Sequence, residues 1–207
     1  MLIKTIPVGQ LEENCYVVTN EDTLQCVLID PGDESNAILD YVEDNKLKIQ
    51  AILLTHGHYD HVGAVRPICE ELGNSIPVYL NIKDDAAQAG DVYWAYRLPE
   101  NGIHCSEGDV IKAAGFEFEV IETPGHTPGG ITLRCQDVLF TGDTLFRGSC
   151  GRTDMPGGNM DDEIKSLGKI CSLPGDYEVY PGHMDPTSLD RERSLNYYCR
   201  LAMGKTE

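Results

Sequence analysis

The sequence predicts an α/β fold in which β-rich runs and amphipathic helical runs are interleaved in mixed order. Residues 51–54 form a continuous apolar run, which is typical of a strand buried on both faces. Within residues 116–121, apolar side chains alternate with glutamates, as in a half-exposed strand. Apolar residues recur at helical spacing at Val62, Val65, Cys69 and Leu72. This pattern alone does not fix the topology.

The first half of the chain predicts strands over 1–9, 15–18 and 26–29, and the third of these ends at the turn signal Asp30-Pro31-Gly32. Asp33 is the expected N-cap of the next helix. The apolar face of that helix consists of Ala37, Ile38, Tyr41 and Val42. In the helix after residue 54, Pro67 predicts a kink or a later start, and Gly73 marks the end.

In the second half, residues 131–133 and 138–140 predict two further strands. The next helix presents one apolar face, made of Ile164, Leu167 and Cys171. Thr187 and Asp190 resemble a capping box that opens a last helix. The apolar residues of that last helix are Leu195, Tyr198 and Leu201.

Length and charge restrict the classes of partner. The 207 residues fit a single domain, expected to cover 1–207. The formal net charge of -18 disfavours nucleic acid and anionic membranes as partners. No signal-like h-region and no apolar run of about 20 residues is visible, so a cytoplasmic protein is expected. The sequence does not indicate an oligomeric state.

The eight cysteines are scattered and form no C-x-x-C pair, which argues against a sulfur-ligated zinc site. In a reducing compartment they are expected to be small, mostly buried apolar residues. Cys150 is the exception to watch, because it lies in a glycine-rich loop close to the candidate site described next.

Chemistry concentrates in residues 55–61, which follow the buried strand and precede a helix. His56, His58 and His61 lie within six residues of one another, with Asp60 between them. Packed into a core, so many imidazoles would leave ring nitrogens unpaired at a high cost in free energy. Imidazole and carboxylate groups at such a turn suit a divalent metal such as zinc, iron or manganese.

Three more residues occupy the ends of β-rich runs. His126 and His183 each lie in a Pro-Gly turn, where a loop holds a side chain at the rim of a sheet. Asp143 follows the strand at 138–140, and its parallel placement favours a metal ligand over a simple turn residue. His104 has no such setting and is expected to be a surface or packing residue.

The motif from His56 to His61, followed by His126, Asp143 and His183 in that order, resembles the metallo-β-lactamase superfamily over the whole chain. The resemblance implies an αββα sandwich, with mixed sheets flanked by helices, and two divalent metals at one edge, most simply zinc. It implies that His56, His58 and His126 hold the first metal and that Asp60, His61 and His183 hold the second. Asp143 would bridge them, and Asp60 and Asp143 are the expected catalytic carboxylates.

Within that superfamily the chain is most similar to short hydrolases of the glyoxalase II type, through residues 141–146 and 150–152. The resemblance implies hydrolysis of a thioester such as S-lactoylglutathione by hydroxide held between the metals, and it places Arg152 at a substrate-contacting position. Arg147 is a second candidate for orienting an anionic substrate. Asp154 stands where longer relatives carry an aromatic contact, and their C-terminal helical substrate domain is not expected in this chain.

Two other functions are open. A persulfide dioxygenase with a single iron shares the pattern Gly151-Arg152-Thr153-Asp154, although the sequence around His183 is more similar to the hydrolases. A non-enzymatic metal-binding module is the alternative outside catalysis, but all seven expected ligands are present. The acidic composition disfavours a nuclease, and the lack of a secretory signal disfavours a β-lactamase.

Overall fold

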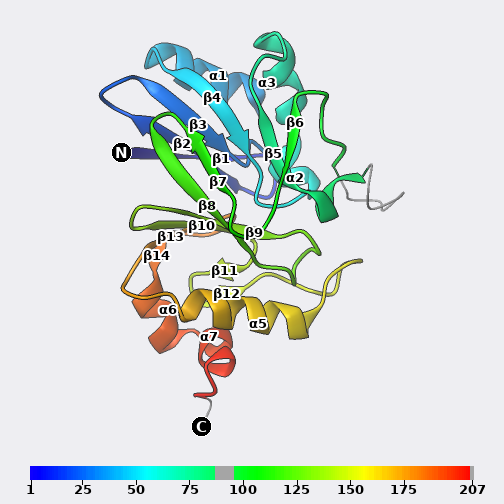
Figure 1. Ribbon diagram of the computed structural model, residues 1–207, viewed down its shortest axis with the longest axis vertical. Helices are drawn as coiled ribbons and strands as arrows, with labels where there is room; N and C mark the ends of the chain where they lie inside the picture. Colours follow the sequence, from blue (N-terminus) through cyan, green and yellow to red (C-terminus); the bar gives the residue numbers. More distant parts are fainter. Residues whose placement is uncertain (87–95, 206–207) are drawn as a thin grey trace.

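The computed structural model of the chain describes residues 1–86 and 96–205. Two six-stranded sheets pack face to face, and helices cover the outer face of each sheet (Figure 1). In the view of Figure 1, α1 and α3 lie above the first sheet and α5 to α7 lie below the second. The expected αββα sandwich with mixed sheets is confirmed.

The first sheet contains the N-terminal half of the chain in sequential order, β1-β2-β3-β4-β5-β6. The pairs β1–β2 and β2–β3 are antiparallel, and the later pairs are parallel. Its strands are β1 Leu2–Val8, β2 Glu13–Asn20, β3 Gln25–Ile29, β4 Lys48–Leu53, β5 Val78–Asn81 and β6 Gly102–Cys105.

The second sheet has the order β14-β13-β10-β9-β8-β7, and a small hairpin of β11 and β12 lies beside it. Only β10 and β13 are paired in parallel. The strands are β7 Val110–Ala113, β8 Phe116–Glu122, β9 Ile131–Cys135, β10 Val138–Gly142, β11 Leu145–Phe146, β12 Ser149–Cys150, β13 Glu178–Pro181 and β14 Thr187–Ser188.

The helices complete the two outer layers. They are α1 Ser35–Asp44, α2 Tyr59–Val62, α3 Val65–Glu71, α5 Met160–Cys171, α6 Leu189–Leu195 and α7 Tyr197–Ala202, with a 3₁₀ turn at Ile82–Asp84. In the part of the chain that the structure describes, no helix is long and apolar enough to cross a membrane.

Strand β4 shows why its continuous apolar run is required. Ala51 and Leu53 pack into the core between the two sheets, whereas Ile52 and Leu54 pack under α1 and α3. Both faces are therefore buried, as the sequence predicts. A third apolar cluster lies between the second sheet and α5 to α7.

Three predicted helix details are wrong. Asp33 does not cap α1: Glu34 precedes the helix in a left-handed conformation, and the Asp33 carboxylate accepts the Glu34 N–H instead. Ser188, not Thr187, caps α6, and its hydroxyl accepts the Arg191 N–H. The predicted last helix is two helices, because Asn196 is extended and caps α7.

Pro67 is associated with a later start of the helix, which is the second of the two effects predicted for it. It stands in the first turn of α3, where a backbone N–H has no helical partner in any case. The helical pattern from Val62 to Leu72 is accordingly divided into α2 and α3.

Candidate metal centre

The candidate ligands lie where strands of both sheets end at one common edge. Residues 56–61 follow β4 and enter α2, and His126 follows β8. Asp143 and His183 follow β10 and β13, which are parallel neighbours and therefore end side by side. Four segments far apart in the sequence thus deliver their polar side chains to one place.

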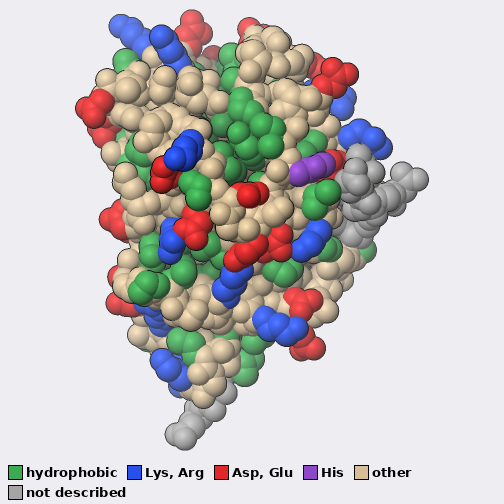
Figure 2. Space-filling model, viewed as in Figure 1, with side chains coloured by type: hydrophobic (Ala, Val, Ile, Leu, Met, Phe, Trp, Pro, Cys, Tyr) green, Lys and Arg blue, Asp and Glu red, His purple; other side chains and the backbone are tan. Residues whose placement is uncertain are grey.

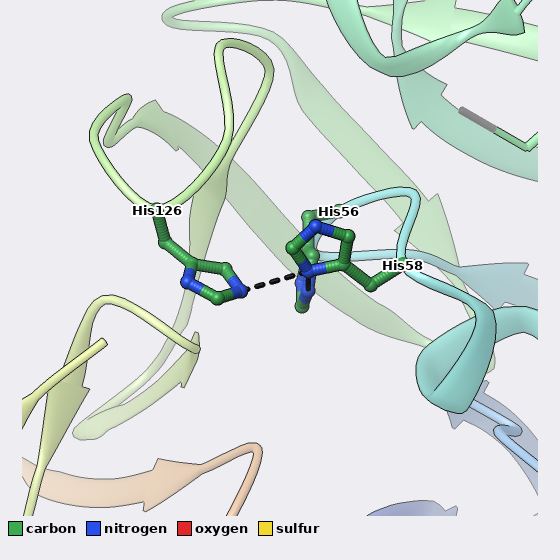
Figure 3. Close-up of side chains that lie close together, drawn as sticks. All are labelled: His56, His58 and His126. Atoms are coloured by element: carbon green, nitrogen blue, oxygen red, sulfur yellow. Dashed lines mark hydrogen bonds between the residues drawn. The ribbon is translucent and has the colours of Figure 1, made fainter. Parts of the chain in front are cut away.

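His56, His58 and His126 form the first group, and their rings point at one another (Figure 3). The Nδ1 atom of His58 lies 3.0 Å from Nε2 of His56 and 2.8 Å from Nε2 of His126. All three side chains are buried. Three ring nitrogens therefore converge, as the ligands of a single cation do.

Asp60, His61 and His183 form the second group. Nε2 of His183 lies 3.4 Å from the Asp60 carboxylate. Asp143 lies between the groups: one carboxylate oxygen is 3.4 Å from Nε2 of His61, and the other is 3.3 Å from Nε2 of His126. The geometry suits a carboxylate that contacts two ions.

Backbone carbonyls fix the tautomers of two of these histidines. Nδ1 of His126 lies 2.7 Å from the carbonyl oxygen of Arg152, and Nδ1 of His183 lies 3.2 Å from that of Leu11. A carbonyl oxygen only accepts hydrogen bonds, so each Nδ1 carries the proton. Each Nε2 then presents a lone pair to the centre, as a metal ligand must.

Asp30 orients two more histidines, His61 directly and His56 through Thr55. Its carboxylate accepts hydrogen bonds from the backbone N–H and the hydroxyl of Thr55, at 2.7 and 2.6 Å, and lies 3.0 Å from Nδ1 of His61. Because the Thr55 hydroxyl donates to Asp30, its oxygen can accept from Nδ1 of His56 at 3.1 Å. The Nε2 atoms of His56 and His61 are therefore also directed toward the centre.

These groups fit divalent metal ions. Nε2 of His61 and one oxygen of Asp143 are buried and have no hydrogen-bond partner. Burial, followed by the nearby His126, lowers the pKa of His58 to about 4, so that its imidazole is neutral at pH 7. Burial opposes ionisation of Asp143, but His61 and other nearby imidazoles hold the pKa of Asp143 well below its usual range. Burial opposes protonation of His61 and His183, but nearby carboxylates, Asp143 and Asp60 among them, raise the pKa of both rings, so a metal ion that binds there must displace protons.

A model of the metallo-β-lactamase superfamily matches residues 8–183. The chain belongs to this superfamily. It is 34% identical to hydroxyacylglutathione hydrolase GloC of Haemophilus influenzae over 95% of this chain and 96% of that protein. That relative has no appreciable extra length, so the similarity extends over both chains.

Solved superfamily members show the same architecture. The B3 metallo-β-lactamase BLEG-1 matches with a TM-score of 0.85 and 34% identity, covering 96% of this chain and 99% of that one. TTHA1623 in a di-iron-bound form matches with a TM-score of 0.78 and 37% identity, covering 94% of this chain and 99% of that one. ETHE1 from Myxococcus xanthus matches with a TM-score of 0.81 and 28% identity, covering 98% of this chain and 85% of that one.

Three buried carboxylates accept hydrogen bonds from the candidate site, and the sequence analysis did not predict them. Glu163, in the first turn of α5, accepts the backbone N–H of His126 at 3.0 Å. Asp84 accepts the N–H groups of Gly57 and Gly129, and thereby ties the histidine loop after β4 to the loop after His126. Asp30 is the third, and its position at the end of β3, parallel to β4, was a usable signal.

The remaining candidates occupy different environments. The side chains of Arg152 and Arg147 are exposed and pair with Asp154 and Asp185, respectively. Like the other seven cysteines, Cys150 is buried with a free thiol. It packs into the cluster beneath α5 to α7, and burial raises its pKa to about 12, so that it is a thiol and not a nucleophilic thiolate at pH 7.

His104 lies apart from the seven candidate ligands. It is on strand β6, and its Nε2 lies 2.8 Å from the Asp85 carboxylate. The expectation of a surface or packing residue agrees with this pairing, and the side chain is 37% exposed.

Proposed function

We propose that this protein is a binuclear metal-dependent hydrolase that acts on a thioester such as S-lactoylglutathione. The observation that carries the proposal is the convergence of ring nitrogens in the first group, where Nδ1 of His58 lies within 3.0 Å of Nε2 of both His56 and His126, beside a second group joined to them through Asp143. One proton cannot satisfy several lone pairs that face each other, whereas a cation can. Similarity to GloC supports the thioester as substrate.

Two divalent ions, most simply zinc with iron or manganese as alternatives, would lower the pKa of a coordinated water towards about 7 and polarise a carbonyl group. The chain would hold the first ion through His56, His58 and His126 and the second through Asp60, His61 and His183, with Asp143 shared. Asp30 and the carbonyl oxygens of Arg152 and Leu11 keep the imidazoles oriented. Asp60 and Asp143 are the proposed catalytic carboxylates.

A thioester suits this centre because the leaving group needs little help. A thiol has a pKa of about 8.5, so a thiolate departs without a dedicated proton donor. Five histidines are assigned to the metals, and the sixth, His104, is paired with Asp85. An amide or an alkyl ester, whose leaving group is far more basic, would need a general acid that the proposed roles do not provide.

The deciding experiment compares hydrolysis with oxygenation. Protein reconstituted with zinc under anaerobic conditions is expected to release free thiol from S-lactoylglutathione. The physical reason is that hydrolysis consumes only water, and that Asp60, His61 and His183 complete a second metal group that a single-iron enzyme leaves unused. The measurement is thiol release, followed with a colorimetric thiol reagent, with zinc-free protein as the control.

Persulfide dioxygenation is the second candidate, because ETHE1 is among the solved neighbours at 28% identity. The same preparation loaded with iron is therefore offered glutathione persulfide in air. Oxygen uptake there, together with no thiol release from any thioester tried, would replace the hydrolase proposal with the dioxygenase. A β-lactam belongs in the same panel because of BLEG-1.

A substitution of Arg152 tests the proposed substrate contact. Arg152→Ala is expected to raise KM for S-lactoylglutathione far more than it lowers kcat, because an ionic contact to a carboxylate of the thiol part is made equally in the ground and transition states. Steady-state kinetics measure both constants. An unchanged KM would remove Arg152 from the substrate site.

A further inference from the structure

The turn that carries His183 follows β13 in the second sheet, but the first sheet holds it in place. Asn14, at the start of β2 in the first sheet, donates its side-chain amide to the carbonyl oxygens of Pro181 and Met184, at 3.1 and 2.8 Å. Its backbone N–H donates to the carbonyl oxygen of Gly182 at 2.8 Å. One residue of the first sheet thus binds the backbone on both sides of the candidate ligand.

The same segment of the first sheet makes two more contacts with this turn. The hydroxyl of Tyr16 also donates to the carbonyl oxygen of Pro181, and the carbonyl oxygen of Leu11 accepts the hydrogen bond of the His183 ring. The bonds to Pro181 are buried, so water does not readily replace a lost donor there. The position of His183 therefore depends on a short stretch of chain around β2.

The backbone of Met184 explains why the turn needs such support. Its φ angle is 70°, a left-handed conformation that is uncommon for a residue other than glycine and persists only where the surroundings hold it. The amide of Asn14 donates directly to the carbonyl oxygen of Met184. Without this bond the turn is free to relax, and the imidazole of His183 moves with its backbone.

We propose that Asn14 is a positioning residue for His183 and, through it, for the second metal ion. Asn14 is not one of the seven candidate ligands, and it acts by fixing the backbone from which a ligand projects. The first metal group has a support of its own, because the Asp84 carboxylate accepts the N–H of Gly57. The inference rests on the proposed binuclear function and adds to it a residue that controls occupancy of the second site.

The expected effect of losing the Asn14 amide is confined to one site. When His183 is displaced, the second ion keeps its other ligands. These are Asp60, His61 and the shared Asp143. Binding of the second ion is therefore weakened and not abolished, and changes in residues that orient a ligand typically lower metal affinity by about 10- to 100-fold.

The test measures the two zinc affinities separately. Asn14→Ala removes the side-chain amide and keeps the backbone bond to Gly182. In calorimetric titration of the metal-free protein, the variant is expected to bind its second zinc ion about 10- to 100-fold more weakly than the wild type, with the first ion unaffected. Thioester hydrolysis at limiting zinc should fall and should recover as zinc is raised, as mass action requires. A defect in catalysis itself would not recover.

Asn20→Ala is the matched control. Asn20 lies at the other end of β2, and its amide also crosses to the second sheet, where it donates to the carbonyl oxygen of Ala114 at 2.9 Å. This variant should lower Tm and leave both zinc affinities unchanged. Asparagine and alanine are both uncharged, so neither variant alters the acidic and basic side chains that Figure 2 shows interspersed over one face.

Asn14→Ser is the milder variant, and it decides the question if Asn14→Ala does not fold. Serine keeps one hydrogen-bond donor, so the second zinc ion is expected to bind about two- to tenfold more weakly, the effect of one lost hydrogen bond. Equal weakening of both sites, no weakening of the second, or the same selective loss in Asn20→Ala would overturn the role of Asn14.

The two proposals fail in different ways. Wild-type protein that binds two zinc ions but hydrolyses no thioester would contradict the proposed function, and the zinc titrations would still decide the role of Asn14. Wild-type protein that saturates at one ion would contradict the binuclear centre and the role of Asn14 together. Hydrolysis with two ions, and a second affinity that neither substitution of Asn14 changes, would remove the role of Asn14 alone.

Discussion

Replacement of Asp143 by alanine is expected to abolish most of the hydrolytic activity and to lower the metal content at both sites. Its two carboxylate oxygens face His61 and His126, one in each metal group, so one substitution removes a ligand from both. A metal ion contributes several kcal/mol of transition-state stabilisation, which corresponds to a loss of roughly a hundred- to a thousandfold in kcat. Steady-state kinetics and elemental analysis of the reconstituted protein measure the two effects.

His104→Ala is the matched control, because it also breaks a contact between a histidine and an aspartate, but on strand β6. It should retain two metals per chain and nearly full activity. An essential His104 combined with a dispensable Asp143 would show that the ligand assignment is wrong. Saturation of the wild-type protein at one metal per chain would contradict the binuclear centre.

Gly151→Ala is expected to destabilise the protein and to disturb the centre at the same time. A Cβ atom on Gly151 would lie 1.8 Å from the backbone oxygen of Asp143 and 3.2 Å from Cβ of His126. The first contact is with backbone, which cannot rotate away, so the strand end that carries Asp143 must shift. Overpacking of this kind costs about 1–3 kcal/mol, and Tm should fall by roughly 2–12 °C.

Gly168→Ala provides the comparison for that measurement. Gly168 lies inside α5, and the nearest atom to an added Cβ is at 3.4 Å, an ordinary contact. Alanine is favoured over glycine in a helix interior by about 1 kcal/mol, so this variant should keep or raise Tm. Calorimetry of both variants, with and without metal, separates the loss of packing from the loss of ligation. An unshifted Tm for Gly151→Ala would contradict the described packing around Asp143.

The candidate ligands could be singled out in the sequence because their signal is local, and their assignment to metals stays a prediction. Three histidines between positions 56 and 61 have no satisfactory explanation as core residues, and the strand-end positions of His126, Asp143 and His183 follow from short β-rich runs. The fold class follows from the same runs. The order of strands within each sheet does not, because pairs such as β3–β4 and β10–β13 join strands that are separated in the sequence by a helix.

The supporting carboxylates were missed for a different reason. Asp30 was interpreted only as part of a turn signal with Pro31 and Gly32, although it ends a strand just as Asp143 does. Glu13 is fully buried, with one oxygen 3.7 Å from Nδ1 of His61, yet the sequence around it is an ordinary strand. Burial raises the pKa of Glu13 well above its usual value. A single acidic residue carries no pattern that reveals such burial.

The helix ends illustrate the limits of short motifs. Thr187 and Asp190 have the spacing of a capping box, but the hydroxyl of Ser188 accepts the N–H of Arg191 instead. Thr187 donates to Glu192, a fully buried carboxylate that also accepts the N–H of Gly148. Glu192 thus links Thr187 to Gly148 of the β11–β12 hairpin. A motif of a few neighbouring residues does not reveal such a long-range contact.

The division of the ligands between the two sheets has a consequence for the biosynthesis of the protein. Translation produces residues 56–61 early, but the first metal group is incomplete until His126 emerges, and the second until His183 does. At about 5–20 residues per second, a ribosome needs on the order of ten seconds to travel from His61 to His183. During that time the nascent chain exposes a histidine cluster without its partners. With the proposed ligands, insertion of both metals would follow the docking of the second sheet onto the first, after His183 has been made.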